Sequence, residues 1–188
     1  DVRGVFSDIC GYAGIINNAG KNLLSIINDI LDISKIEAGK MEIREDSYML
    51  SSVLNDVCNL ISVRAASRDL AFHIAVEDCL PDHLFGDAGR VRQIMLNLLN
   101  NAVKYTDRGS VSLSVHAGED TAFIEGQVIS LNIAVLDTGV GIRPEDREKL
   151  FSKFERIGLG KSEEVEGSGL GLTIVKNLLD MMGGTIRS

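Results

Sequence analysis

The sequence lacks any excess of positive charge. Its 27 Asp and Glu residues outnumber its 19 Lys and Arg residues, which gives a net charge of −8. A chain this acidic is a poor general binder of nucleic acid or of anionic membrane surfaces. Any anionic ligand must therefore be attracted locally, by a divalent cation, backbone N–H groups and a few basic side chains.

Paired cysteines and long apolar runs are also missing. Cys10, Cys58 and Cys79 form no C-x-x-C pair, which fits reduced thiols in a cytosolic setting and excludes a disulfide framework or a typical zinc site. No apolar run approaches the ~18–20 residues that span a bilayer, and no signal-peptide pattern is present. We therefore expect a cytoplasmic location and no membrane contact by these residues, although a longer parent protein could carry a membrane anchor.

The first 39 residues carry a heptad repeat. Ile9, Ile16, Leu23 and Ile30 recur every seven residues, and a second series lies three positions further on: Tyr12, Ala19, Ile26 and Ile33. Such a stripe favours helix–helix pairing, so we expect a long coiled-coil-like helix that ends near Gly39 and packs on a partner. A core helix of the same domain is the alternative.

From Lys40 onward the pattern changes to that of an α/β unit. It predicts a short strand at 41–44, a helix at 50–68, a strand at 70–76, a loop at 82–87, a helix capped by Asp87 and ending near Tyr105, strands at 111–116 and 129–136, and a helix at 170–182. This order indicates an α/β (α+β) two-layer sandwich, in which helices cover one face of a mixed sheet. The long helix precedes it.

The helix that ends near Tyr105 carries a polar face. Asn97, Asn101 and Lys104 are separated by four and three residues, so they share one side. An amide oxygen can complete an octahedral Mg²⁺ shell, and a lysine can contact the same phosphates. Taken alone, however, this triplet is most often an ordinary solvated helix face.

Two glycine-rich segments follow this helix. The first, Asp137-Thr138-Gly139-Val140-Gly141-Ile142, follows a predicted strand, and its glycines allow close backbone approach to a base. Its carboxylate could accept a hydrogen bond from an exocyclic amine, although a plain β-turn is the alternative. The second, Gly167-Ser168-Gly169-Leu170-Gly171-Leu172, opens a helix whose N-terminus favours phosphate. Together with the Asn helix, these segments predict a nucleotide pocket closed by a mobile lid.

Two other phosphate-binding motifs are excluded. Gly160-Lys161-Ser162 ends like a P-loop, but the first glycine of that motif would fall on Glu155, and no strand precedes it. The segment at 167–172 lacks the third glycine of the dinucleotide fingerprint, because Leu172 stands in its place.

In this order the segments resemble the C-terminal portion of a sensor histidine kinase, whose ATP-binding fold is shared with gyrase, heat-shock chaperone and mismatch-repair ATPases. The similar segments are 97–104 (N box), 137–141 (G1 box), Phe151-Ser152-Lys153-Phe154 (F box), 167–171 (G2 box) and 33–39 (end of the second dimerisation helix). The resemblance implies two parts. Residues 1–39 would belong to the dimerisation and phosphoacceptor domain, and residues 40–188 would form the ATP-binding catalytic domain without its last strand or strands.

The resemblance also implies roles for single residues. Asn101 would bind Mg²⁺, Lys104 would contact phosphate, Tyr105 would lie beside adenine and Asp137 would read it. Asn97 would support the water shell of the metal, and it is the one candidate for a catalytic role. The other expected cofactor contacts are Gly139, Gly141, Ile142, Phe154, Gly167, Gly169, Leu170, Gly171 and Leu172. Residues 151–168 would form the lid.

The implied function is the ATP-binding and phosphoryl-donating part of a two-component kinase, with ATP and Mg²⁺ as cofactors. The phosphoacceptor of the family is a histidine followed by an acidic residue, and none of His73, His83 and His116 is followed by one. We therefore expect the acceptor upstream of this chain and no autophosphorylation by the chain alone. The implied partners are a second copy in a parent homodimer and a response-regulator receiver domain, with no nucleic acid.

Two other functions are considered. An ATP-hydrolysing relative would carry a Glu general base at the place of Asn97, and an amide cannot take a proton from water. A non-catalytic nucleotide-binding module would instead signal through dimer geometry. The intact glycine-rich segments argue against this second alternative.

Overall fold

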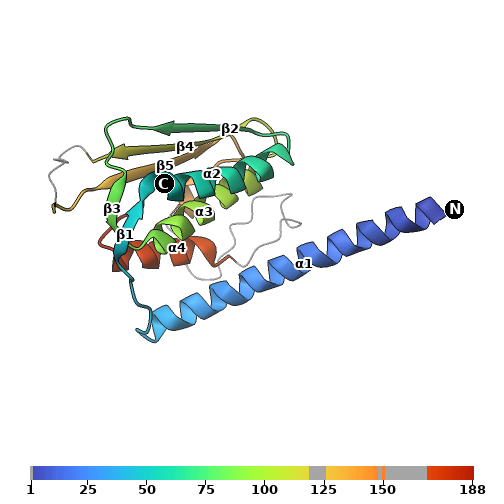
Figure 1. The fold of residues 1–188 in the computed structure, drawn as a ribbon, viewed down its shortest axis with the longest axis horizontal. Coiled ribbons are helices and arrows are strands. Elements are labelled where there is room, and N and C mark those ends of the chain that lie inside the picture. Colours follow the sequence, from blue (N-terminus) through green and yellow to red (C-terminus); the bar gives the residue numbers. More distant parts are fainter. Residues whose placement is uncertain (1, 119–125, 148–149, 151–168) are drawn as a thin grey trace.

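The computed structural model describes residues 2–118, 126–147, 150 and 169–188, and it shows a long helix followed by an α/β unit (Figure 1). In chain order the elements are α1 (Val2–Glu37), β1 (Asp46–Met49), α2 (Leu50–Ala66), β2 (Ala71–Val76), β3 (His83–Gly86), α3 (Ala88–Tyr105), β4 (Ser110–Ala117), β5 (Leu131–Asp137), the short 3-10 helix η1 (Pro144–Asp146) and α4 (Gly171–Met181). This arrangement confirms the predicted α/β class.

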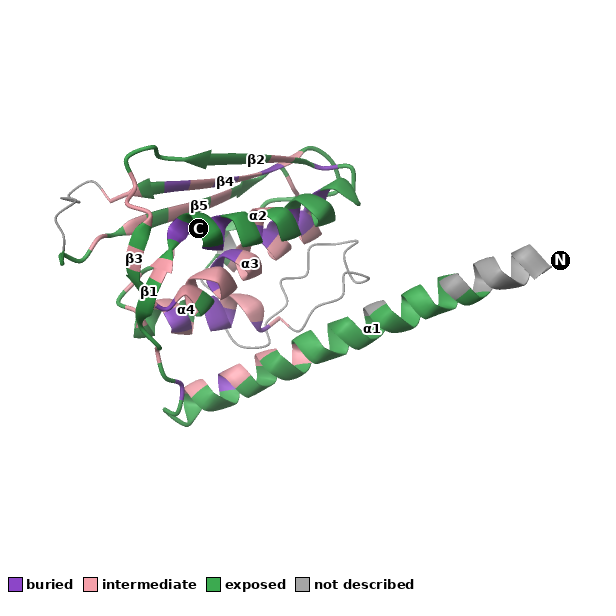
Figure 2. Cartoon of the chain, in the orientation of Figure 1, coloured by how far each residue is buried: buried purple, intermediate pink, exposed green. Residues whose placement is uncertain are grey.

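Helix α1 is one uninterrupted element of 36 residues, about 54 Å long at 1.5 Å per residue. It extends away from the α/β unit, and most of its described side chains are exposed (Figures 1 and 2). Heptad residues such as Ile16 (71 % exposed) and Leu23 (59 %) are open, whereas Ile33 near the end of the helix is buried. Across the part of the chain that is described, neither α1 nor any other helix is long and apolar enough to cross a membrane.

The central sheet is mixed, as predicted. Its strand order is β2-β4-β5, with β2 parallel and β5 antiparallel to β4. Burial alternates along β4: Val111, Leu113 and Val115 are fully buried, whereas the residues between them are more open. This period of two shows that one face of the sheet packs on the core. Helices α2 and α3 lie on that face (Figure 1).

The main core lies between this face and the two helices. Its largest fully buried side chains include Ile61 of α2, and Met95 and Leu99 of α3. Shortening such a leucine to alanine usually costs ~2–5 kcal/mol. Because the apolar side of α3 is fixed by this core, the orientation of its polar side is fixed as well.

A second apolar cluster joins α4 to α3 and to the end of α1. Ile174, Val175 and Leu178 of α4 are fully buried, and they pack with Ile33 of α1 and Ile94 of α3. The cluster sets the position of α4 on α3. It thereby also places the glycine-rich segment that leads into α4.

Two predicted segments differ from the structure. The expected strand at 41–44 has no regular secondary structure, and Met41 is buried in the second cluster instead. The expected loop at 82–87 contains β3, which pairs antiparallel with β1. Each of these strands has four residues, and so short a strand is specified mainly by its partner and not by its own sequence.

Candidate functional site

Helix α3 is positioned by capping at both ends. At its start Asp87 is the N-cap residue, and its Oδ1 accepts a hydrogen bond from the Arg90 N–H at 3.0 Å, as the sequence predicts. At its end the Arg68 guanidinium donates to the carbonyl oxygens of Val103 (2.6 Å) and Lys104 (2.9 Å). Free carbonyls at a helix C-terminus favour such a cationic donor. The last turn of α3 is thus tied to the segment that follows α2.

The polar face of α3 emerges beside the core, as its spacing predicts. Asn97, Asn101 and Lys104 are all half-buried, so their polar atoms reach solvent from a fixed helix. The Lys104 ammonium lies 4.8 Å from the centre of the Tyr105 ring, within cation–π range. Within the described residues, the Asn101 amide makes no hydrogen bond. Its oxygen is therefore available to a ligand.

The first glycine-rich segment is held directly against the end of α3. The Val140 N–H donates to the Tyr105 carbonyl at 3.4 Å, and the Gly139 N–H donates to Asp137 Oδ1 at 2.9 Å. A Cβ on Gly139 would lie 2.3 Å from the Tyr105 oxygen, so only glycine fits there. Gly141 has φ of +69°, in the left-handed region that favours glycine. This contact places the exposed Asp137 and Ile142 near Tyr105.

A second anchor holds the same segment to the start of β4. The Ser110 N–H donates to Thr138 Oγ1 at 3.0 Å, and the Thr138 N–H donates to the Ser110 carbonyl at 3.1 Å. A Cβ on Gly109 would lie 2.2 Å from Thr138 Oγ1. The sequence predicts a turn at Gly109, but it gives no sign of this contact.

The second glycine-rich segment meets the middle of α3. The Asn97 side-chain N–H donates to the Gly171 carbonyl at 3.4 Å, across 74 positions of sequence. Gly169 has φ of +69°, Leu170 is buried and Leu172 is half-buried. The first turn of α4, a helix N-terminus of the kind that favours anions, therefore lies beside the polar face of α3.

Some expected site residues lie outside the described residues. These are Phe154 and Gly167, together with the whole expected lid at 151–168. The described residues nevertheless bring three predicted segments together, since Tyr105 contacts the first glycine-rich segment and Asn97 contacts the second. Sequence reasoning missed Arg68 and Thr138, because their partners are distant in the chain.

The side chains present fit a Mg²⁺ ion that is held mainly by substrate phosphates and by water. Over the described ranges, no group of three or more His, Cys, Asp or Glu side chains could hold a metal. Asn101 instead offers one neutral oxygen. Mg²⁺ commonly keeps several waters and is bound through one or two protein oxygens together with substrate phosphates. A single amide on the face of α3 that meets the start of α4 through Asn97 is consistent with that mode.

The histidines do not form part of this arrangement. His73 on β2, His83 at the start of β3 and His116 on β4 are all exposed. The position of His83 in a strand corrects its expected place in a loop. None of the three lies on α1.

The comparisons of this chain with known proteins agree on one family. Residues 86–188 match the family described as histidine kinase-, DNA gyrase B-, and HSP90-like ATPase. The chain is 39 % identical over 171 residues to the sensory/regulatory protein RpfC of Xanthomonas campestris pv. campestris, in an alignment that covers 91 % of this chain and 23 % of RpfC. It is 34 % identical over 175 residues to the signal transduction histidine-protein kinase BarA of Escherichia coli K12, covering 93 % of this chain and 19 % of BarA.

A solved structure shares the fold. Full-length ShkA in complex with AMPPNP is similar with a TM-score of 0.71 and 34 % sequence identity, over 92 % of this chain and 34 % of ShkA. The chain thus spans about a third or less of each of these relatives.

Proposed function

The chain belongs to the histidine kinase-, DNA gyrase B-, and HSP90-like ATPase family, and from this premise we propose that it is the ATP-binding, phosphoryl-donating portion of a two-component sensor histidine kinase. Residues 1–39 supply the second dimerisation helix and residues 40–188 the catalytic domain. One observation carries the proposal: Tyr105 of α3 contacts the first glycine-rich segment and Asn97 contacts the second, so a single helix organises the described part of the site.

The adenine end of the nucleotide lies at the first glycine-rich segment. The Asp137 carboxylate accepts a hydrogen bond from the exocyclic amine of adenine, while Gly139, Gly141 and Ile142 let the backbone approach the ring. The Tyr105 carbonyl lies directly against Gly139, so Tyr105 borders this position from α3. The nucleotide in the ShkA complex, AMPPNP, is an adenine nucleotide, which is consistent with this assignment.

The phosphates lie between α3 and the start of α4. Lys104 and the N-terminus of α4 offer them positive charge. Asn101 holds the Mg²⁺, with Asn97 supporting its water shell. When bound, the ion neutralises charge on the phosphate oxygens during phosphoryl transfer. Leu170 and Leu172 border this end. Phe154 and Gly167 lie outside the described residues and keep the cofactor-contact roles that the family resemblance implies.

The acceptor is a histidine outside this chain. Phosphoryl transfer needs an acceptor nitrogen held in line with the γ-phosphate, and none of the histidines present lies on α1. The exposed heptad face of α1 would pair in the homodimer of the parent protein. The phosphoryl group then passes to an aspartate of a response-regulator receiver domain. Nucleic acid has no part in this scheme.

ATP hydrolysis is the less favoured activity, for a reason visible at Asn97. Its amide donates to the Gly171 carbonyl, and an amide cannot act as general base toward water. Release of free phosphate at the rate of ATP use would favour the hydrolytic function over phosphoryl donation.

Calorimetry of ATP binding to Asp137→Asn tests the proposed nucleotide site. Asparagine keeps the Oδ1 that accepts the Gly139 N–H, so the turn survives while the charge is lost. We expect ATP affinity with Mg²⁺ to fall by ~1–3 kcal/mol, the scale of a hydrogen bond to a charged group. Asp180→Asn, the same change at an exposed position of α4, should leave affinity unchanged. Equal affinity in wild type and Asp137→Asn would refute the adenine contact.

A further inference from the structure

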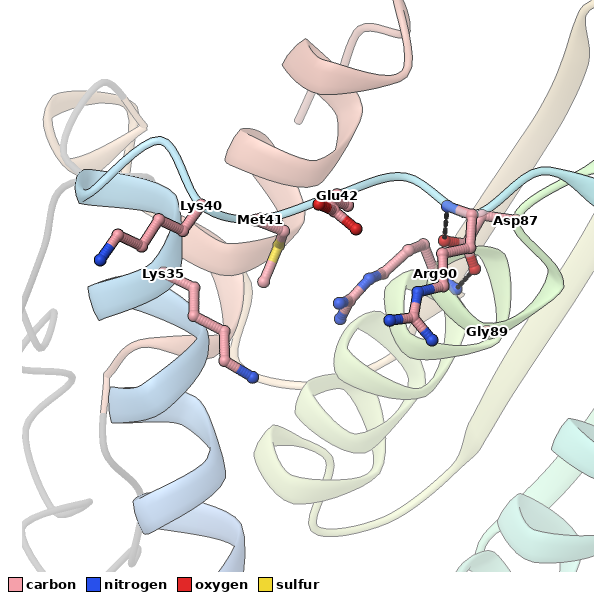
Figure 3. Close-up of a pocket in the computed structure, with 8 residues that line it drawn as sticks. Lys35, Lys40, Met41, Glu42, Asp87, Gly89 and Arg90 are labelled. Carbon is pink, nitrogen blue, oxygen red and sulfur yellow. Dashed lines mark hydrogen bonds between the residues drawn. The ribbon is translucent and has the colours of Figure 1, made fainter.

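A basic groove lies where the end of α1 meets the start of α3, away from the glycine-rich segments. It has a volume of about 520 Å³. The residues that line it come from α1, the connector after it and the start of α3: Lys35, Lys40, Met41, Glu42, Arg44, Asp87, Gly89 and Arg90 (Figure 3). Four of the eight are basic and two are acidic, in a chain whose net charge is −8. The groove thus reverses the overall charge of the chain.

The acidic residue Asp87 is already occupied by backbone donors. Its Oδ2 accepts the Arg44 N–H at 2.9 Å and its Oδ1 accepts the Arg90 N–H at 3.0 Å. It therefore fixes the connector to the first turn of α3, and within the described residues it forms no ion pair with the basic side chains that line the groove.

One of the four basic side chains is also occupied. The Arg90 guanidinium donates to Gln93 Oε1 at 2.7 Å and lies 3.6 Å from the Asp32 carboxylate of α1. Gln93 in turn donates to Asp32 at 2.7 Å. These contacts form a direct link between α1 and α3 at one end of the groove.

The other three basic side chains form no such pairs. Within the described residues, Lys35, Lys40 and Arg44 make no side-chain hydrogen bond and no ion pair. In Figure 3, Lys35 extends from α1 across the groove toward α3, whereas Lys40 extends away from it. Lys35 therefore brings a positive charge from α1 into the groove that Arg44 also lines from the connector.

We propose that this groove binds a small phosphorylated anion, held by Lys35 of α1 and Arg44 of the connector. Phosphate oxygens accept charge-assisted hydrogen bonds from both kinds of side chain. Because the two residues belong to different elements, the anion bridges them and strengthens the link that Asp32 makes with α3. Binding thus fixes α1 against the α/β unit at a site separate from the nucleotide.

The test is titration of the ¹⁵N-labelled chain with inorganic pyrophosphate at constant ionic strength, followed by NMR. We expect saturable shifts at the amides of 40–44, Gly89 and Arg90. Lys35→Ala and Arg44→Ala should each weaken this binding about fivefold or more, the effect of losing one charge-assisted hydrogen bond. Lys21→Ala removes the same charge from an exposed position of α1 outside the groove, and it should leave the binding within about twofold of wild type.

Three outcomes would overturn the proposal. The first is a set of shifts that rises linearly with pyrophosphate concentration and does not saturate. The second is a loss of affinity in Lys21→Ala equal to that in Lys35→Ala, and the third is a set of shifts confined to the amides of 139–141 and 169–171. The last would assign pyrophosphate to the nucleotide site. Repeating the titration with Asp137→Asn keeps the two sites distinguishable, since the groove shifts should persist whether or not ATP binding is lost. Lys35→Gln, which removes the charge but keeps a polar side chain that is only slightly shorter, should weaken binding as Lys35→Ala does.

Discussion

Replacing Gly139 by alanine should impair nucleotide binding through a backbone clash. The added Cβ would lie 2.3 Å from the Tyr105 carbonyl oxygen and 2.9 Å from its carbon. A carbon–oxygen contact normally needs about 3.3 Å, so the segment would have to move by roughly 1 Å. Neither atom can rotate away, because both belong to the backbone of α3. The Val140 N–H bond to Tyr105 would be lost, and Asp137 would move with the segment.

The expected loss can be bounded and measured. Misplacing a positioning group by about 1 Å can cost up to ~100-fold, and we expect ATP affinity to fall by ~10-fold to ~100-fold in calorimetry with Mg²⁺. Gly86→Ala is the matched control, since its Cβ would meet only Tyr48 at an ordinary 3.7 Å. The reasoning fails if Gly139→Ala binds ATP like wild type, or if Gly86→Ala loses as much affinity.

Three further changes have defined outcomes. Asn101→Ala should weaken ATP binding measured with Mg²⁺ much more than binding measured without it; equal losses would rule out metal ligation. Arg68→Ala should lower the free energy of unfolding by ~1–3 kcal/mol in urea, because the partly buried end of α3 loses its donor, and slower hydrogen exchange at Lys104 would contradict this. The Ser51 N–H, which donates to Asp82 at 2.7 Å, lowers the pKa of that carboxyl. Asp82 therefore stabilises the fold above about pH 4 and less as pH falls. The free energy of unfolding, measured in urea, should fall less steeply with decreasing pH in Asp82→Asn than in wild type.

Local patterns in the sequence predicted the helices well because their signals lie close together. Asp87 and the apolar spacing of the following residues specify α3, and its Asn face follows from the same period. The order of the two glycine-rich segments also predicted which parts of the chain meet at the site. In each case the structure follows from residues close together in the sequence or from a motif whose segments occur in a fixed order.

Contacts between distant segments could not be predicted in this way. Strand β3 forms because its four residues pair with β1, and nothing within β3 itself distinguishes it from a loop. Arg68 lies just beyond the last turn of α2 and reads as an ordinary surface residue until its two acceptors on α3 are known. Ile33 belongs to the heptad series, yet it is buried against α4 in this chain.

The central claim is that this chain donates the γ-phosphate of ATP to a histidine that it does not contain. The most direct test incubates the chain with γ-labelled ATP and Mg²⁺, alone and with a separate first dimerisation helix that carries the phosphoacceptor histidine. Acid-labile label is predicted on the added helix only, because no histidine of this chain lies on α1. Stoichiometric label on the chain alone, or release of free phosphate without any label on the helix, would contradict the account.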